Sequence, residues 1–365
     1  MKALVIGGTG PTGPHIVEGL RQRGFKVATL NRGVHPVPLP DDVERIIADP
    51  HFAEPLKAAL EGRSFDVVVA AYGRLKATAE VLAGRAGHFV AVGGAVAYRG
   101  FNVASENWPS GFLTPVRETA PLAGPEHDRF ESLVAAAERT LFDFHPTATL
   151  FRYPYVYGPR QVTPREWSLV RRVLDGRRTI VVMHGGLGLN SHAYAENAAH
   201  AILLAVDNPT IAASKAYNCA DDDQINHRQL IEIGAQALGV ELEVVSIPDV
   251  PSTYGALLAV DDRLKVLDTS LIRTELGYRD LVPTIEAVTR TVLWYRDNPL
   301  EYGGEYEQRR KDVFDYAAED RLIELYRTFE AGVRAVQLKP RHANYAEHPY
   351  AHPKATVLGR DEKGR

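Results

Sequence analysis

The first half of the chain alternates short apolar runs with segments of helical periodicity. The apolar runs are rich in β-branched residues and stop at glycine or at charged residues, as at Ala3–Ile6. Such continuous apolar strands are typical of a parallel sheet covered on both faces. Further strands are predicted at 26–30, 43–47, 66–70, 88–92 and 148–151, and the first helix from about Pro14 to Arg23. The alternation predicts right-handed βαβ units and an α/β fold with a doubly wound parallel sheet of the Rossmann type.

The pattern loosens after about Tyr153. Helices are predicted at 164–175, 196–206, 227–238 and 283–297, with short strands at 179–182, 216–219 and 243–247. One or two amphipathic helices follow at 305–335, and an extended arm from Lys339 onward. We therefore expect a dinucleotide-binding domain at 1–155, a smaller mixed substrate region at 156–300 that returns in part to the sheet, and C-terminal helices with the arm at 301–365.

A glycine-rich turn lies directly between the first predicted strand and the first predicted helix. Gly7 permits a tight turn out of the strand, Gly10 lets a pyrophosphate approach the backbone, and Gly13 lets helix and strand pack closely. The free N–H groups at the start of the helix favour an anionic ligand. The turn therefore predicts a dinucleotide site that includes Gly7, Thr9, Gly10, Pro11, Thr12 and Gly13. A glycine-rich turn without a ligand is the alternative.

The end of the second strand indicates which dinucleotide is bound. An NAD site usually has Asp or Glu here to accept hydrogen bonds from the ribose. The chain has Asn31 and Arg32 instead, and the guanidinium of Arg32 suits a 2′-phosphate. NADP(H) is therefore preferred, with NAD(H) as the alternative if Arg32 only stacks on adenine or faces solvent. Asp49, after the third strand, is placed to meet the adenine amino group, or it is an ordinary surface carboxylate.

Several segments in this order resemble the extended short-chain dehydrogenase/reductase superfamily, which contains the NAD-dependent epimerases and dehydratases. The resemblance covers about residues 1–300. Its motifs are the loop Gly7–Gly13, Ala70 and Ala71 after the fourth strand, and the segments 92–98, 152–160, 276–278 and 291–295. The resemblance implies a Rossmann fold and a nicotinamide cofactor, with Ala70 and Ala71 among the residues that bind it. Tyr72, which follows them, either borders the nicotinamide ribose or only packs.

The same resemblance identifies where catalytic groups normally stand. The superfamily uses a Ser or Thr after the fifth strand and a Tyr-x-x-x-Lys on the next helix, where the tyrosine transfers a proton and the lysine lowers its pKa. With Glu138 aligned to the acidic end of that helix, the tyrosine position is Phe130 and the lysine position is Val134. The hydroxyl position is Gly93 or Gly94. We therefore expect the triad to be absent.

Two residues are candidates for a replacement proton donor. Tyr98 lies at the carboxyl end of the fifth strand, where its phenol could face the nicotinamide; it could equally only shape the pocket. His127 precedes Phe130 by three residues, one helical turn away on the same face, and an imidazole transfers protons near neutral pH. A helix cap or a solvent-exposed position is the favoured interpretation of His127.

Other polar and aromatic residues rank lower. Tyr155 and Tyr157 are expected near the substrate entrance, more for packing than for chemistry, and His184 and His192 flank a glycine loop at 185–190. Arg152 and Arg160 either anchor an anionic substrate or form structural ion pairs. Arg171, Arg172, Arg177 and Arg178 form a basic group expected at a solvated helix edge, and the C-terminal arm carries His342, Tyr345, His348, Tyr350 and His352. We expect that arm to pack on its own domain or on a neighbouring subunit rather than to hold a metal.

Composition narrows the class of protein. The chain has 365 residues, 45% of them hydrophobic and 24% charged, and a net charge of −4. Proteins that bind nucleic acids need clustered Lys and Arg to contact the phosphates, and the net charge of this chain is negative. No nucleic-acid partner is therefore expected. A single cysteine, Cys219, excludes a disulfide within the chain and favours a reducing, cytoplasmic location. No secretory signal and no apolar run long enough for a membrane span are expected, and a homodimer is considered.

Three functions remain open at this point. The first is an NADP(H)-dependent oxidoreductase acting on a small carbonyl, alcohol or enone with a non-standard proton donor. The second is an epimerase or dehydratase that holds NAD(P) tightly, which needs more proton transfers. The third is a non-catalytic dinucleotide sensor or an RNA-associated protein.

Overall fold

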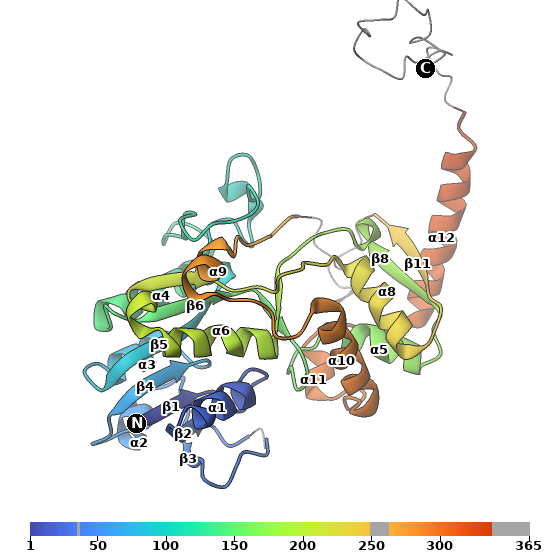
Figure 1. Ribbon diagram of the computed structural model, residues 1–365. Coiled ribbons are helices and arrows are strands. Elements are labelled where there is room, and N and C mark those ends of the chain that lie inside the picture. Colours follow the sequence, from blue (N-terminus) through green and yellow to red (C-terminus); the bar gives the residue numbers. More distant parts are fainter. Residues whose placement is uncertain (35–36, 249–262, 338–365) are drawn as a thin grey trace, which may run out of the picture. The chain divides into compact units, whose positions relative to one another are not determined.

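A seven-stranded, fully parallel sheet forms the centre of the computed structural model, which describes residues 1–34, 37–248 and 263–337 (Figure 1). The strand order is β10-β6-β5-β4-β1-β2-β3, and each neighbouring pair is parallel. The strands are β1 (Lys2–Ile6), β2 (Lys26–Asn31), β3 (Glu44–Ile47), β4 (Phe65–Ala70), β5 (Ala86–Gly94), β6 (Thr149–Tyr153) and β10 (Lys215–Asn218). The predicted doubly wound Rossmann sheet is confirmed, and β10 shows the later part of the chain returning to it. Because the order reverses at β1, a crevice opens where β1 and β4 end.

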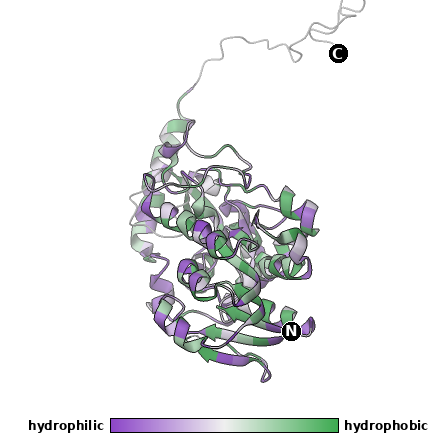
Figure 2. Cartoon of the chain, turned by 90° about the vertical axis from the view of Figure 1, so that its left-hand side faces the viewer, coloured by the Kyte–Doolittle hydropathy of each residue, from purple (hydrophilic) through white to green (hydrophobic). Residues whose placement is uncertain are grey.

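Helices cover both faces of this sheet, and Figure 2 shows both hydrophilic and hydrophobic residues along them. One face packs against α1 (Gly13–Gln22), α6 (Ala195–Asp207) and α9 (Ser270–Leu276). The other packs against α2 (Ala53–Ala59), α3 (Leu75–Val81) and α4 (Arg129–Phe144). Strand residues such as Leu4 and Val5 point to opposite faces and are both fully buried. This two-sided burial explains the unbroken apolar runs in the sequence.

A second core lies beside the ends of the strands. It consists of α5 (Trp167–Leu174), α8 (His227–Leu238), α10 (Thr284–Asp297) and the parallel pair β8 (Thr179–Met183) and β11 (Glu243–Ile247). A short parallel pair, β7 (Tyr155–Tyr157) and β9 (His192–Tyr194), leads into it. The remaining short elements are α7 (Pro209–Ala212), η1 (Ala95–Ala97), η2 (Ala104–Glu106) and η3 (His184–Gly186).

Residues 301–314 are tied to this second core. The buried guanidinium of Arg172 forms an ion pair with Asp312 at 2.8 Å, and the indole of Trp167 donates to Glu307 at 2.8 Å. Glu307 lies on the short helix α11 (Glu305–Gln308). Arg171 also pairs with Glu307, at 2.7 Å. The expectation that Arg171 and Arg172 lie at a solvated helix edge is therefore wrong, because acidic residues from 301–314 neutralise both inside the protein.

The chain divides into two compact units, Met1–Phe314 and Asp315–Arg365. In the second unit, helix α12 spans Tyr316–Arg334 and begins with a hydrogen bond from the amide of Ala318 to the side chain of Asp315. The predicted arm and its histidines and tyrosines lie outside the described residues. The boundaries expected at 155/156 and 300/301 do not coincide with this division, and they stay predictions.

Membrane-spanning helices and metal-ligand clusters are both absent from the described part of the chain. None of the described helices is long and apolar enough to cross a membrane. The described residues also contain no group of three or more His, Cys, Asp or Glu side chains that could hold a metal ion.

Candidate active site

The loop between β1 and α1 holds two glycines that the fold itself requires. Gly7 has a φ of +90°, and a Cβ on it would lie 2.3 Å from the Cβ of Tyr72. A Cβ on Gly13 would lie 2.3 Å from the carbonyl carbon of Gly8. Neither position has room for a side chain, so Gly7 sets the turn and Gly13 sets the close packing of α1, as predicted.

Gly10 has different surroundings. A Cβ there would meet nothing closer than the carbonyl oxygen of Gly7, 3.5 Å away, and Gly10 lines a cavity. Thr12 is the N-cap of α1, and its side chain makes no capping hydrogen bond. A helix N-terminus approached through an open backbone favours an anion. The residues present at this loop therefore fit the diphosphate of a dinucleotide.

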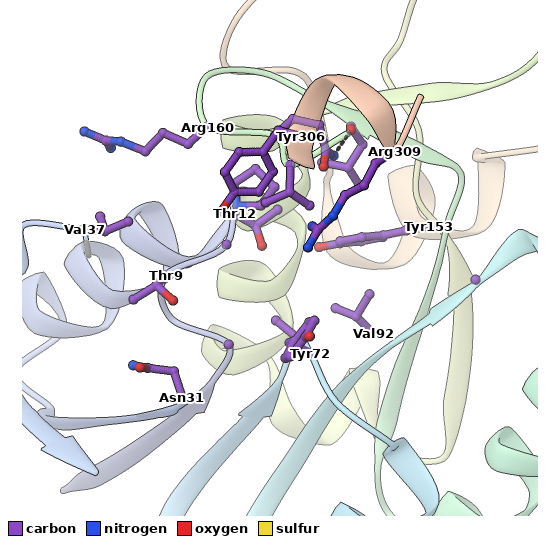
Figure 3. Close-up of a pocket in the computed structure, with 18 of the residues that line it drawn as sticks. Thr9, Thr12, Asn31, Val37, Tyr72, Val92, Tyr153, Arg160, Tyr306 and Arg309 are labelled. Atoms are coloured by element: carbon purple, nitrogen blue, oxygen red, sulfur yellow. Dashed lines mark hydrogen bonds between the residues drawn. The ribbon is translucent and has the colours of Figure 1, made fainter. Parts of the chain in front are cut away.

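The cavity has a volume of about 770 Å³ and lies at the carboxyl ends of the parallel strands. In Figure 3, Thr9 and Asn31 lie on one side of it, and Tyr306 and Arg309 enter from α11 and the residue after it. The polar and aromatic residues that line it are Thr9, Thr12, Asn31, Arg32, Tyr72, Phe101, Tyr153, Arg160, Gln161, Trp294, Tyr295, Tyr306 and Arg309. The smaller residues include Gly7, Gly10, Pro11, Ala71, Val92, Gly93, Gly94, Val96, Val156 and Leu300. Ala70, one residue earlier, is buried as the last residue of β4 and does not line the cavity.

The end of β2 presents an amide and a guanidinium to the cavity. The side-chain oxygen of Asn31 accepts a hydrogen bond from the amide of Gly33 at 2.8 Å, which fixes the turn after the strand. The guanidinium of Arg32 lies 5.8 Å from the centroid of the Tyr72 ring. Arg32 is exposed, so its remaining donors are open to a ligand.

Asp49 follows β3, and its carboxylate is bonded to His51. Its carboxylate accepts hydrogen bonds from the amide of His51 at 3.0 Å and from the imidazole of His51 at 2.8 Å, and these lower the pKa of Asp49. Asp49 does not line the cavity. Both bonds involve one carboxylate oxygen, and the contact expected between Asp49 and adenine stays a prediction.

The three positions of the superfamily's catalytic groups lie in two different places. Gly93 and Gly94 line the cavity, whereas Phe130 and Val134 lie on α4 and do not. Phe130 is 59% exposed. The alignment that puts the tyrosine and lysine positions on these two residues stays a prediction.

Tyr98 is part of a buried polar network rather than of the cavity wall. Its hydroxyl donates to Asn218 at 2.8 Å and accepts from Arg152 at 2.9 Å, and Arg152 forms a buried ion pair with Glu138. Burial raises the pKa of Tyr98 to about 12. The prediction that its phenol faces the nicotinamide is not supported, because the turn η1 after β5 directs Tyr98 into the protein interior.

His127 lies before α4 rather than on it. The N-cap of α4 is Asp128, whose carboxylate accepts from the amides of Phe130 and Glu131. The imidazole of His127 accepts from the amide of Gly124 at 2.9 Å. His127 does not line the cavity, so the structure supports the local interpretation of this residue and not the catalytic one.

The tyrosines of the cavity differ in what their hydroxyl groups do. Tyr153 donates to the carbonyl of Ala198 at 2.5 Å, and Tyr295 donates to the carbonyl of Gln161 at 2.8 Å. Burial raises the pKa of both phenols, so neither is a ready acid. Tyr72 is 46% exposed and remains accessible from the cavity.

Of the residues that ranked lower as functional candidates and are described here, only Arg160 lines the cavity. Tyr155 donates to the carbonyl of Thr163 at 3.1 Å, and Tyr157 donates to Asp221 at 2.9 Å. Burial lowers the pKa of His192 to about 3, and neither His192 nor His184 lines the cavity. Arg160 does line it, from a left-handed conformation with φ of 65°.

Sequence reasoning assigned no role to Tyr295, Tyr306 or Arg309. Trp294 and Tyr295 lie on α10, within a segment that carried the family resemblance, so that signal was available. Tyr306 lies on the four-residue helix α11 and Arg309 directly follows it; so short an element has no periodicity to detect.

No protein-family model matches the chain. Among curated proteins, the chain is 28% identical over 258 residues to a 3-diazoavenalumate denitrifying reductase from a Streptomyces species. That match covers 66% of this chain and 82% of the reductase. The chain is also 32% identical over 143 residues to a dTDP-glucose 4,6-dehydratase from an Actinoplanes species, covering 39% of this chain and 42% of the dehydratase.

Solved structures support the same fold. A UDP-glucose 4-epimerase from Thermus thermophilus, in complex with NAD, superposes with a TM-score of 0.63 at 23% identity. This match covers 81% of the present chain and 99% of the epimerase. The relatives whose activities are named are thus a reductase, a dehydratase and an epimerase, and the predicted Rossmann architecture is that of a known group of enzymes.

Proposed function

We propose that this chain, which belongs by fold and by sequence resemblance to the extended short-chain dehydrogenase/reductases, is an NADP(H)-dependent oxidoreductase acting on a small carbonyl, alcohol or enone. The observation that carries the proposal is the pairing of an open phosphate loop with Arg32 in one cavity. Gly10 and the start of α1 would hold the diphosphate, and Arg32 the 2′-phosphate. A bound nicotinamide supplies or accepts a hydride.

The lining of the cavity favours a reaction with few proton transfers. Among the described residues that line it there is no histidine, lysine, cysteine or carboxylate. Epimerisation and elimination each move several protons and need positioned acids and bases. A single hydride transfer needs one proton, which solvent or the exposed phenol of Tyr72 can supply. The reductase named among the relatives adds support to this choice.

The first experiment measures dinucleotide preference. NADPH and NADH are titrated into the protein, and binding is followed by the increase in nicotinamide fluorescence. We expect saturable binding with NADPH preferred, and we expect Arg32→Ala to reduce that preference by about tenfold or more, because a charge-assisted hydrogen bond is lost. Arg74→Ala is the matched control, since Arg74 is exposed, follows strand β4 of the same sheet and does not line the cavity. An unchanged NADPH-to-NADH ratio in Arg32→Ala would reject the 2′-phosphate role.

The second experiment separates the reductase from the other two functions. Purified protein is incubated with NADPH and panels of aldehydes, ketones and enones, and absorbance of the reduced nicotinamide is recorded. An oxidoreductase consumes NADPH in proportion to product. An epimerase or dehydratase regenerates its bound dinucleotide within each cycle, so it converts nucleotide sugars with no net change in absorbance. A sensor binds NADPH but converts neither the carbonyl and enone compounds nor the nucleotide sugars.

A further inference from the structure

The substrate side of the cavity receives a guanidinium from the segment that follows α10. Arg309, the residue after α11, extends into the cavity beside Tyr306 (Figure 3). One of its terminal nitrogens is paired with Glu305 at 2.5 Å, and its guanidinium carbon lies 5.1 Å from the centroid of the Tyr306 ring. These two neighbours orient Arg309, and a guanidinium has five N–H donors, so others remain for a ligand.

The positive charge of the cavity is spread over three separate places in its lining. Its described lining contains three arginines and no carboxylate. Arg32 lies at the end of β2, where the 2′-phosphate is expected. In Figure 3, Arg160 lies on the side of Val37 and Thr12, and Arg309 lies on the side of Tyr153. Arg160 is thus nearer to the phosphate loop, and the donors of Arg309 that Glu305 does not occupy can meet a different anion.

The wall around Arg309 is aromatic and apolar. Tyr153, Trp294, Tyr306 and Leu300 line this part of the cavity, and the hydroxyl of Tyr153 is occupied by the carbonyl of Ala198. Flat aromatic side chains bury a planar apolar ligand well, and a cation at the edge of such a wall can fix its orientation. A sugar ring, which needs many hydrogen-bonding partners, is less suited to such a wall.

We propose that Arg309 anchors the carboxylate of an aromatic carboxylic acid whose apolar part lies against this wall. The inference rests on the proposed function, because it names the substrate class of the same site. Arg309 holds the anionic end by charge-assisted hydrogen bonds, so the electrophilic part of the substrate lies toward Val92 and Gly93 at the floor of the cavity. Arg309 is thereby a specificity residue for this site.

The test uses trans-cinnamate as the probe and trans-cinnamamide as its neutral analogue. Each is titrated by calorimetry into the full-length protein saturated with NADP⁺. We expect cinnamate to bind about tenfold or more tightly than cinnamamide. Arg309→Gln is expected to abolish this difference and to leave the affinity for NADP⁺ unchanged, while Arg309→Lys restores part of it. Arg296→Gln removes the same charge from exposed surface outside the cavity and is expected to behave like the native protein.

Several results would overturn the inference. They are equal affinities for the acid and the amide, no binding of cinnamate, or an Arg309→Gln variant that binds cinnamate normally. Loss of NADP⁺ affinity in Arg309→Gln would make Arg309 a diphosphate contact instead. If the native protein binds no NADP⁺, the proposed function fails, and titration of cinnamate without NADP⁺ still decides whether Arg309 forms an acid-binding site.

Discussion

Single residues in the phosphate loop have separable roles, although the sequence shows only a run of glycines. Gly13 is required for packing, because a Cβ there would overlap the carbonyl group of Gly8. Gly10 has no such neighbour, so its missing side chain leaves room for a ligand rather than for the fold. Stability and binding should therefore respond differently to substitution at these two positions.

We expect Gly10→Ala to unfold at nearly the native temperature but to bind NADPH about tenfold or more weakly, because its methyl group enters the space that the diphosphate needs. We expect Gly13→Ala to be destabilised by about 1–3 kcal/mol, since overpacking forces the backbone to shift. Thermal unfolding and NADPH fluorescence titration check both variants. A Gly10→Ala variant with native affinity would show that no ligand approaches this loop.

Tyr98 shows the limit of residue-level prediction. The sequence placed it correctly after β5, but its hydrogen-bond partners Asn218 and Arg152 come from strands far along the chain. No local pattern reveals such partners, so the sequence could not show that Tyr98 is buried.

We expect Tyr98→Phe to lower the free energy of unfolding by about 1–3 kcal/mol, because Asn218 and Arg152 each lose a buried partner. Its NADPH affinity and any turnover should stay close to native. Urea unfolding and steady-state assays provide the measurements, with Tyr72→Phe as a control that should keep native stability. A stable Tyr98→Phe variant without turnover would restore the proton-donor role.

Whole elements were predicted best where burial fixes their pattern. The sheet strands and α8 are buried on defined faces, so their apolar positions identified them, and α8 begins and ends where expected. Helix α5 is shorter than the predicted 164–175, because Pro164 and Glu166 lie buried in the loop before it. The loop between β1 and α1 could be assigned because glycine is required there. The other side of the cavity could not, since it depends on how α10 and α11 fold back to the sheet.

Asp221 joins several elements in the folded protein. It accepts hydrogen bonds from the amide of Tyr194 at 2.8 Å, from Asn197 at 3.0 Å and from Tyr157 at 2.9 Å. Burial, and next the charge of Asp280, raise its pKa to about 7. The connection between β9, α6 and the loop after β10 therefore depends on a carboxyl group that titrates near neutrality.

Because the pKa of Asp221 is raised in the folded state, its contribution to the free energy of unfolding changes with pH in a known direction. The folded state holds its proton on Asp221 more strongly than the unfolded state does, so this contribution is complete below the unfolded pKa and is lost as the pH rises through about 7. We expect the Asp221 contribution to the free energy of unfolding to fall from about pH 4 to about pH 7. Asp221→Asn should flatten that slope in urea titrations, whereas Asp41→Asn, at an exposed site, should leave it unchanged. A native slope in Asp221→Asn would contradict the assignment.

At the scale of the whole molecule, the unit Met1–Phe314 contains every described residue of the cavity and of the three largest apolar clusters. The prediction that residues 301–365 form one C-terminal part did not anticipate that 301–314 neutralise the buried Arg172. Acidic residues so far from their partner carry no sign of that pairing in the sequence.

We expect a variant that ends at Phe314 to fold and to bind NADPH with native affinity. A variant that ends at Leu300 should lose about 3–5 kcal/mol of stability, because the buried ion pair between Arg172 and Asp312 is broken. Circular dichroism, urea unfolding and NADPH titration compare the two. Equal stability of both variants would show that 301–314 contributes no essential contacts.

The cavity is lined both by residues from 7–12 and by residues from 306–309, which lie near opposite ends of the unit Met1–Phe314 in sequence. On the ribosome, the phosphate loop therefore emerges first, and the segment with Tyr306 and Arg309 emerges last. The cavity is complete only after almost the whole of this unit has been synthesised.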